Sequence, residues 1–250
     1  MYDKVVVFGD SFATESNNIP GHPENRDFLW FRVLADYLNS SVEVYGLGGT
    51  SIEWSLNNLI SYTENNDIQN SVCVFVKTDA NRYHLNSLEP QQHAVTYMLS
   101  DSKWSWFNSI NKSYIEKVRW LHKELPSYTK KQKDISCFAT CDLFSKRWKK
   151  FIFISAFEDD YTLKLQPSNM TVYDTFLNSV SYAEGIPYSI VQQGDPRICH
   201  LSKPNHILLA KKLNDVIINV PKSENSFVKD LYSNCVTYDD YVDKNKDLSK

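Results

Sequence analysis

Two short segments near opposite ends of the chain carry residue types that could perform nucleophilic chemistry. Ser11 ends the segment Gly9-Asp10-Ser11, directly after the apolar run Val5–Phe8, and His200 precedes a helix-like segment near the other end. A serine hydroxyl is a weak nucleophile until a base takes its proton, and histidine is the most frequent base. The run Val5–Phe8 fits a buried parallel strand, and ligands of open α/β sheets bind at the carboxyl ends of such strands. Ser11 can therefore act as a nucleophile if His200 reaches it.

Together the two segments resemble a known enzyme family. Phe8-Gly9-Asp10-Ser11-Phe12 and, in the same order along the chain, His200-Leu201-Ser202 are similar to motifs of the SGNH (GDSL-type) hydrolases and esterases. The resemblance covers most of residues 4–220. It implies a three-layer α/β/α, flavodoxin-like fold with a parallel sheet of about five strands. It also implies acyl transfer without a cofactor, in which Ser11 attacks, its N–H faces the oxyanion and His200 is the base.

A glycine-rich turn matches the family's second motif. Gly46-Leu47-Gly48-Gly49 follows a predicted strand, where the family places a glycine N–H that donates to the oxyanion. The family's Gly-x-x-Gly spacing selects Gly49, and a shift of one residue selects Gly48. A tight strand-to-helix turn would need these glycines as well, and the two interpretations are compatible.

The third motif departs from the family pattern. The family usually has Gly-x-Asn-Asp after its third strand, whereas this chain has Lys77-Thr78-Asp79-Ala80-Asn81-Arg82. Asn81 is the nearest suitable oxyanion donor, with Thr78 or a backbone N–H as the alternative. Loss of one such donor costs about 10²–10³-fold in rate, so the departure also bears on the strength of the activity. Arg82 is expected to be solvated, with binding of an anionic substrate group as the alternative.

The acid that would orient the base is displaced. The family has Asp-x-x-His, but here Arg197 stands three residues before His200 and Asp195 five residues before it. We expect the two extra residues to bring Asp195 back to the imidazole and complete a triad with Ser11. The alternative is a Ser11–His200 dyad whose imidazole is oriented by a backbone carbonyl or water. His206 is expected to have no catalytic role.

Alternating strand and helix patterns predict the scaffold that positions these residues. The expected strands cover residues 4–8, 42–45, 71–77, 151–156 and 186–191, and the expected helices cover 28–38, 52–62, Tyr114 to near Pro126, and 204–220. Residues 127–150 look polar and basic around a short apolar stretch. We expect one hydrolase domain over residues 1–221, with an insert at about 84–150, and a polar appendage or tail over 222–250.

Composition bounds the partners. The chain has 250 residues, 42% of them hydrophobic, and a net charge of −3, so we expect a globular protein that binds no nucleic acid. The basic stretch at 146–150 is expected to be a solvated loop. The five cysteines fit reduced thiols, and Cys137 and Cys141 lack the second pair that a zinc site needs. We expect no metal, no membrane span and no signal peptide, in a cytoplasmic or virion-associated protein whose oligomeric state stays open.

The sequence thus predicts a serine esterase acting on small O-acyl esters. Acetyl groups on a glycan are the first substrate hypothesis, because Tyr83, Trp104, Trp106 and Phe107 could stack on sugar rings. Two alternatives stay open. One is a weak or inactive hydrolase fold kept as a binding or structural module, for instance in a phage particle or a surface-polymer system. The other is an O-acyltransferase that passes the acyl group to a sugar hydroxyl.

Overall fold

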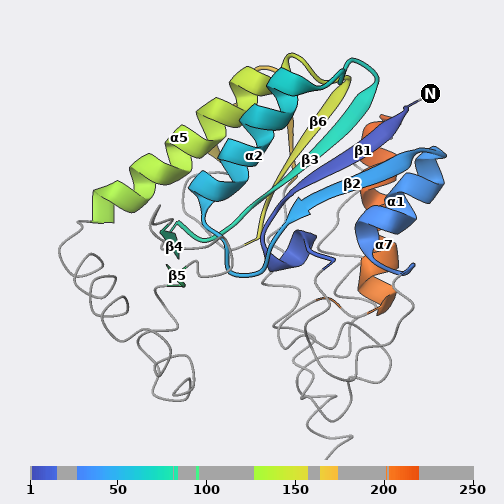
Figure 1. Ribbon diagram of the computed structural model, residues 1–250, viewed down its shortest axis with the longest axis horizontal. Coiled ribbons are helices and arrows are strands. Elements are labelled where there is room, and N and C mark those ends of the chain that lie inside the picture. Colours follow the sequence, from blue (N-terminus) through green and yellow to red (C-terminus); the bar gives the residue numbers. More distant parts are fainter. Residues whose placement is uncertain are drawn as a thin grey trace, which may run out of the picture.

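The structure, a computed structural model, describes residues 2–15, 27–80, 82–83, 94–95, 127–156, 164–173, 201 and 203–219. Along this part of the chain the elements are β1 (Lys4–Gly9), η1 (Ser11–Ala13), α1 (Trp30–Leu38), β2 (Ser41–Gly46), α2 (Ile52–Asn65), β3 (Ser71–Lys77), β4 (Arg82–Tyr83), β5 (Ala94–Val95), α5 (Ser127–Ser145), β6 (Lys150–Ser155), β7 (Thr171–Val172) and α7 (Lys203–Ile217). Figure 1 shows their arrangement.

Five of the strands form one parallel sheet in the order β2-β1-β3-β6-β7. Counted along the chain, this is the 2-1-3-4-5 order of flavodoxin-like folds. Helices α2 and α5 cover one face, and α1 and α7 cover the other (Figure 1). The predicted three-layer α/β/α fold is therefore confirmed. The short strands β4 and β5 pair antiparallel in a separate sheet.

Burial on both faces explains why the central strands are continuous apolar runs. Val5 and Val7 point into the core beneath α1 and α7, whereas Val6 and Phe8 point into the core beneath α2 and α5. Side chains of a strand alternate between its two faces. In a strand covered on both sides, every position therefore faces a core and favours an apolar residue. β3 follows the same rule, and all of its seven residues are buried.

Two elements differ from the sequence-based expectation. α5 occupies a segment that reads as polar and basic, and it covers the sheet with a small buried set that includes Cys137, Phe138 and Cys141. The fifth strand of the sheet is β7, a two-residue strand with no pattern of its own, which pairs with β6. The strand expected at 186–191 and the helix expected from Tyr114 lie outside the described residues.

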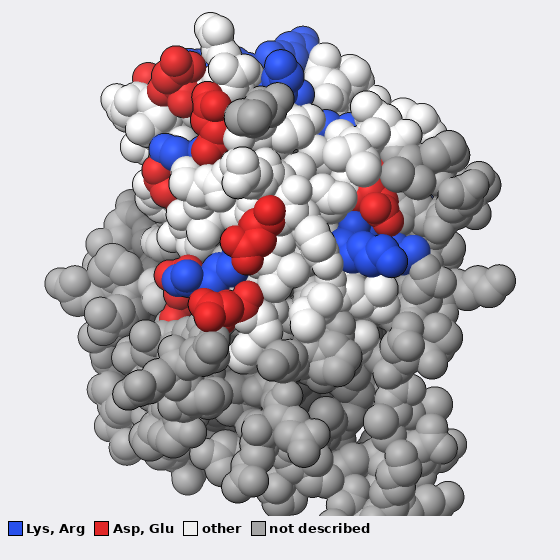
Figure 2. All heavy atoms as spheres, turned by 90° about the vertical axis from the view of Figure 1, so that its right-hand side faces the viewer, with Lys and Arg blue, Asp and Glu red and all other residues white. Residues whose placement is uncertain are grey.

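Acidic and basic side chains lie next to one another on the face shown in Figure 2. In the basic stretch before β6, Lys146, Arg147 and Lys149 are exposed, as expected, while Trp148 is buried and anchors the segment in the core. In the part of the chain that the structure describes, no helix is both long and apolar enough to cross a membrane.

Candidate active site

Ser11 lies at the carboxyl end of β1 and opens the single turn η1. The Asp10 side chain caps this turn, because its Oδ1 accepts the N–H of Phe12 at 3.1 Å. The backbone oxygen of Asp10 also accepts the N–H of Ala13 at 2.9 Å. Phe12 and Ala13 are buried, whereas Ser11 is half-buried. The turn thus holds Ser11 at the end of the sheet between two anchored neighbours.

The order in which strands are added to the sheet reverses at β1. The chain passes from β1 to β2 on one side, and then from β2 to β3 on the other side of β1. The first crossover contains α1 and the second contains α2, which lie on opposite faces of the sheet. In open α/β folds, ligands bind outside the carboxyl ends of the strands at such a switch point. Topology alone therefore marks the end of β1 as a candidate site.

The loop after β2 packs against the Ser11 turn. A Cβ on Gly46, the last residue of β2, would collide with the carbonyl of Ala13, so only glycine fits there. A Cβ on Gly48 would lie 3.7 Å from the Cβ of Ser11. The backbone of the glycine turn therefore lies beside the candidate nucleophile.

The hydrogen bonds that close the glycine turn come from Thr50, and the N–H groups of Gly48 and Gly49 take no part in them. The N–H of Thr50 donates to the oxygen of Leu47 at 3.3 Å, and the Thr50 hydroxyl donates to the same oxygen at 2.8 Å. Gly49 has a φ of 81°, a conformation that favours glycine. The choice between Gly49 and Gly48 as oxyanion donor stays a prediction, and Gly48 is the one with a close approach to Ser11.

A buried ion pair joins the Ser11 loop to the segment beyond β3. Arg82 Nη1 lies 2.7 Å from Asp10 Oδ2, and the exposed fractions of the two side chains are 3% and 0%. The expectation that Arg82 is solvated is therefore wrong, and its burial also argues against the alternative of an anion-binding residue. The hydroxyl of Thr78 donates to the same Asp10 oxygen at 2.8 Å. Because a hydroxyl carries one hydrogen, this bond argues against Thr78 as an oxyanion donor.

Three of the predicted site residues, Asn81, Asp195 and His200, lie outside the described residues. Their immediate neighbours are informative. Arg82 follows Asn81 and is fixed to Asp10. Leu201 follows His200 and is 1% exposed, in the same core cluster as Phe12, which follows Ser11.

Sequence reasoning missed the contacts that join Asp10, Thr78 and Arg82. The one signal that points to these contacts is positional, since Asp10 follows the first predicted strand and Arg82 follows the third. His206, for which no catalytic role was expected, is buried and accepts the N–H of Trp30 at Nδ1.

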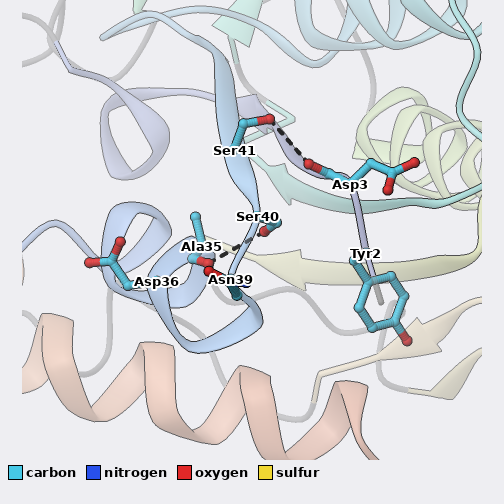
Figure 3. A pocket seen from close by; sticks show the side chains of 7 residues that line it. All are labelled: Tyr2, Asp3, Ala35, Asp36, Asn39, Ser40 and Ser41. Carbon is cyan, nitrogen blue, oxygen red and sulfur yellow. Dashed lines mark hydrogen bonds between the residues drawn. The ribbon is translucent and has the colours of Figure 1, made fainter.

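A pocket of about 510 Å³ lies at the opposite end of the sheet (Figure 3). It is lined by Tyr2, Asp3, Ala35, Asp36, Asn39, Ser40 and Ser41. Asp3 precedes β1 and Ser41 begins β2, so the pocket opens at the amino ends of the strands. It is therefore separate from Ser11, which follows the carboxyl end of β1.

The described residues contain no group of three or more His, Cys, Asp or Glu side chains that could hold a metal ion. Cys73, Cys137 and Cys141 are free thiols and fully buried. Burial raises the pKa of Cys73 and of Cys141 well above the ordinary value of 9.0. Both are therefore thiols at neutral pH.

No family model and no curated protein matches the chain. Several solved structures are similar to it. A member of the lipolytic protein G-D-S-L family from Veillonella parvula has a TM-score of 0.46 at 11% identity, over 87% of this chain and 99% of that one. A putative lipolytic protein of the G-D-S-L family from Desulfitobacterium hafniense has a TM-score of 0.43 at 14% identity, over 85% and 98%. A mutant acetyl-xylooligosaccharide esterase from Geobacillus Stearmophilus has a TM-score of 0.45 at 10% identity, over 88% and 95%. Values this low assign no function.

Proposed function

We propose that the chain is a serine ester hydrolase that works through an acyl-enzyme at Ser11. The observation that supports it is the position of Ser11, half-buried on a capped turn at the switch point of the sheet. In the glycine turn beside it, a Cβ built on Gly48 would lie in ordinary contact with the Cβ of Ser11. A nucleophile next to backbone N–H groups is the arrangement that acyl transfer needs.

In the proposed reaction, His200 takes the hydroxyl proton of Ser11 as Oγ attacks the ester carbonyl carbon. The oxyanion that forms is held by the N–H of Ser11 and by Gly49 or Gly48, with Asn81 as a third donor. The C–O bond to the alcohol then breaks, and the leaving oxygen receives the proton from the imidazolium. Water, deprotonated by His200, attacks the acyl-enzyme, and release of the carboxylic acid returns the proton to Ser11.

The core beneath the site supports the approach of His200. Leu201 and Phe12 each sit next to one of the two reacting residues, and both are buried in one cluster beneath α1 and α7. Membership of Leu201 and Phe12 in this one cluster supports the proposed approach of His200 to Ser11. Asp195 is proposed to orient the imidazole, and the Ser11–His200 dyad is the alternative.

We propose small O-acyl esters as substrates, with acetyl groups on a glycan first. The support is compositional, since Tyr83, Trp104, Trp106 and Phe107 fall in and just before the segment between β4 and α5. Aromatic rings offer flat apolar faces to a sugar ring. Acetylated xylan and acetylated hexosamines should then be cleaved faster than long-chain p-nitrophenyl esters. The reverse order would refute the glycan hypothesis.

A fluorophosphonate probe tests the central claim, because it modifies an activated serine. We expect labelling of the folded chain at Ser11, no labelling of Ser11→Ala, and labelling slowed by about 10²–10⁴-fold in His200→Ala. Ser61→Ala, at an exposed position of α2, is the matched control and should label like the wild type. A folded wild-type chain that stays unlabelled would instead favour the binding module. Transfer of acetyl to an added sugar, in excess of free acetate, would favour the acyltransferase.

A further inference from the structure

We infer that Arg82 is a positioning residue that fixes the three loops around Ser11 relative to one another. The inference rests on the proposed function and extends it. Arg82 Nη1 donates to Asp10 Oδ2 at 2.7 Å and to the backbone oxygen of Thr50 at 3.4 Å. Asp10 belongs to the loop after β1, Thr50 to the loop after β2, and Arg82 itself lies beyond β3. One guanidinium therefore joins all three.

The Asp10 carboxylate is the centre of this junction. It is 0% exposed and accepts hydrogen bonds from the N–H of Phe12, the hydroxyl of Thr78 and the guanidinium of Arg82. A buried carboxylate is tolerated when it is paired and hydrogen-bonded, and loss of one partner leaves an uncompensated charge. Because Ser11 lies between Asp10 and Phe12, the carboxylate fixes the backbone on both sides of the nucleophile.

Arg82 is also held from its other side. Lys133 Nζ, on α5, donates to the backbone oxygen of Arg82 at 2.7 Å and lies 2.9 Å from Glu53 Oε1. Glu53 is in the first turn of α2, the helix that begins directly after the glycine turn. The segment beyond β3 is thus tied to the loop after β2 through Arg82 and to the first turn of α2 through Lys133.

We infer from this arrangement that Arg82 affects the oxyanion pocket indirectly, by positioning the residues that form it. At 3% exposure and in contact with Asp10 and Thr50, Arg82 is placed to hold loops rather than substrate. The donors proposed for the pocket belong by sequence to these same loops, at Ser11, at Gly48 or Gly49, and at Asn81. Such donors must lie about 2.7–3.1 Å from the developing oxyanion, and a misplacement of about 1 Å can cost about 10²-fold in rate.

The test compares Arg82→Met, Arg82→Lys and the double variant Asp10→Asn/Arg82→Met with the wild type. Thermal unfolding measures stability. The rate of fluorophosphonate labelling measures the reactivity of Ser11, which depends on the geometry of the oxyanion pocket. Hydrolysis of p-nitrophenyl acetate separates kcat from KM. We expect Arg82→Met to lower kcat and the labelling rate by about 10²-fold with little change in KM. Arg82→Lys should recover part of both, since its ammonium can pair with Asp10.

The double variant separates positioning from stability, because it removes both buried charges. We expect it to regain much of the stability lost in Arg82→Met while labelling stays slow. If its labelling rate returns together with its stability, Arg82 is merely structural and the inference is overturned. The double variant and Arg82→Lys also answer the question if Arg82→Met fails to fold.

A second buried ion pair provides a matched control. Lys77 Nζ and Asp134 Oδ1 lie 2.6 Å apart with both side chains 2% exposed. Lys77→Met/Asp134→Asn should change stability without slowing the labelling of Ser11, and equal slowing would overturn the specific role of Arg82. Failure of the proposed function looks different, because the wild type itself would then neither label nor hydrolyse esters.

Discussion

His206 Nδ1, on α7, accepts the backbone N–H of Trp30, the first residue of α1, at 3.3 Å. The indole Nε1 of Trp30 donates in turn to the backbone oxygen of Phe12 at 2.8 Å. The residue before α1, Leu29, has no side chain that could cap the helix. The imidazole therefore satisfies a helix N-terminus from a distant part of the chain, and Trp30 links α7 to the Ser11 turn.

Substitution of His206 by leucine should destabilise the fold. His206→Leu keeps apolar volume but leaves the buried N–H of Trp30 without this acceptor, which costs about 1–2 kcal/mol. The free energy of unfolding in urea measures the loss. Ile207→Ala, at the next position and 39% exposed, is the control and should change stability by less than about 0.5 kcal/mol. Equal losses in the two variants would argue against the His206–Trp30 contact.

Two neighbouring glycines should respond differently to alanine. Gly46→Ala places a methyl group on the carbonyl of Ala13, and we expect a loss of about 3 kcal/mol or more, since backbone cannot move aside cheaply. Gly48→Ala meets the Cβ of Ser11 at an ordinary 3.7 Å and should fold normally. Thermal unfolding followed by circular dichroism compares them. Similar melting temperatures would show that β2 does not approach the turn this closely.

The buried cysteines should be inert in the native protein. Cys73, Cys137 and Cys141 are all 0% exposed, and burial raises the pKa of Cys73 and Cys141. Because alkylation needs an accessible thiolate, iodoacetamide at pH 8 should modify these positions only after unfolding. Peptide mass mapping before and after addition of guanidinium checks this. Rapid native modification at Cys137 or Cys141 would mean that α5 opens readily from the sheet.

Asp142 should make stability depend on pH. Burial raises the pKa of its carboxyl, but hydrogen bonds from the backbone N–H groups of Asn169, Ser168 and Met170 lower it more, so the pKa lies below the ordinary 3.8. The ionised form therefore stabilises the fold fully above pH 3.8, and this contribution is lost as pH falls through the lowered pKa.

The matching variant is Asp142→Asn, measured by melting temperature between pH 2 and 7. Its deficit relative to the wild type should be largest near neutral pH and should shrink in acid. Leu143→Ala, at an exposed neighbouring position of α5, is the control and should show a difference that does not vary with pH. A deficit for Asp142→Asn that is constant over the whole range would contradict the assignment.

Elements that are buried on both faces could be predicted from the sequence. β1 and β3 are uninterrupted apolar runs because helices cover each of their faces, and this pattern is local. The Ser11 turn could be predicted for the same reason, since Gly9-Asp10-Ser11 directly follows such a run. Its placement at the carboxyl end of β1 is confirmed.

Elements stabilised by distant polar contacts could not be predicted. α5 buries Asp134 against Lys77, and both of these charged side chains are only 2% exposed in the fold. The expectation that Arg82 is solvated was wrong for the same reason, because its partner Asp10 is 72 residues away in the chain. A single sequence shows each charge alone, and only the fold shows that the charges neutralise one another.

The pairing of α1 with α7 has a consequence for biosynthesis. The last described helix completes a core whose other half, α1 and β1, leaves the ribosome first. Until residues 203–217 are made, the apolar face of the sheet that they cover is partly exposed. The nascent chain can then associate with other molecules through this hydrophobic surface. Translation products that end before α7 should therefore aggregate or be degraded, and only chains that include α7 should accumulate as folded protein.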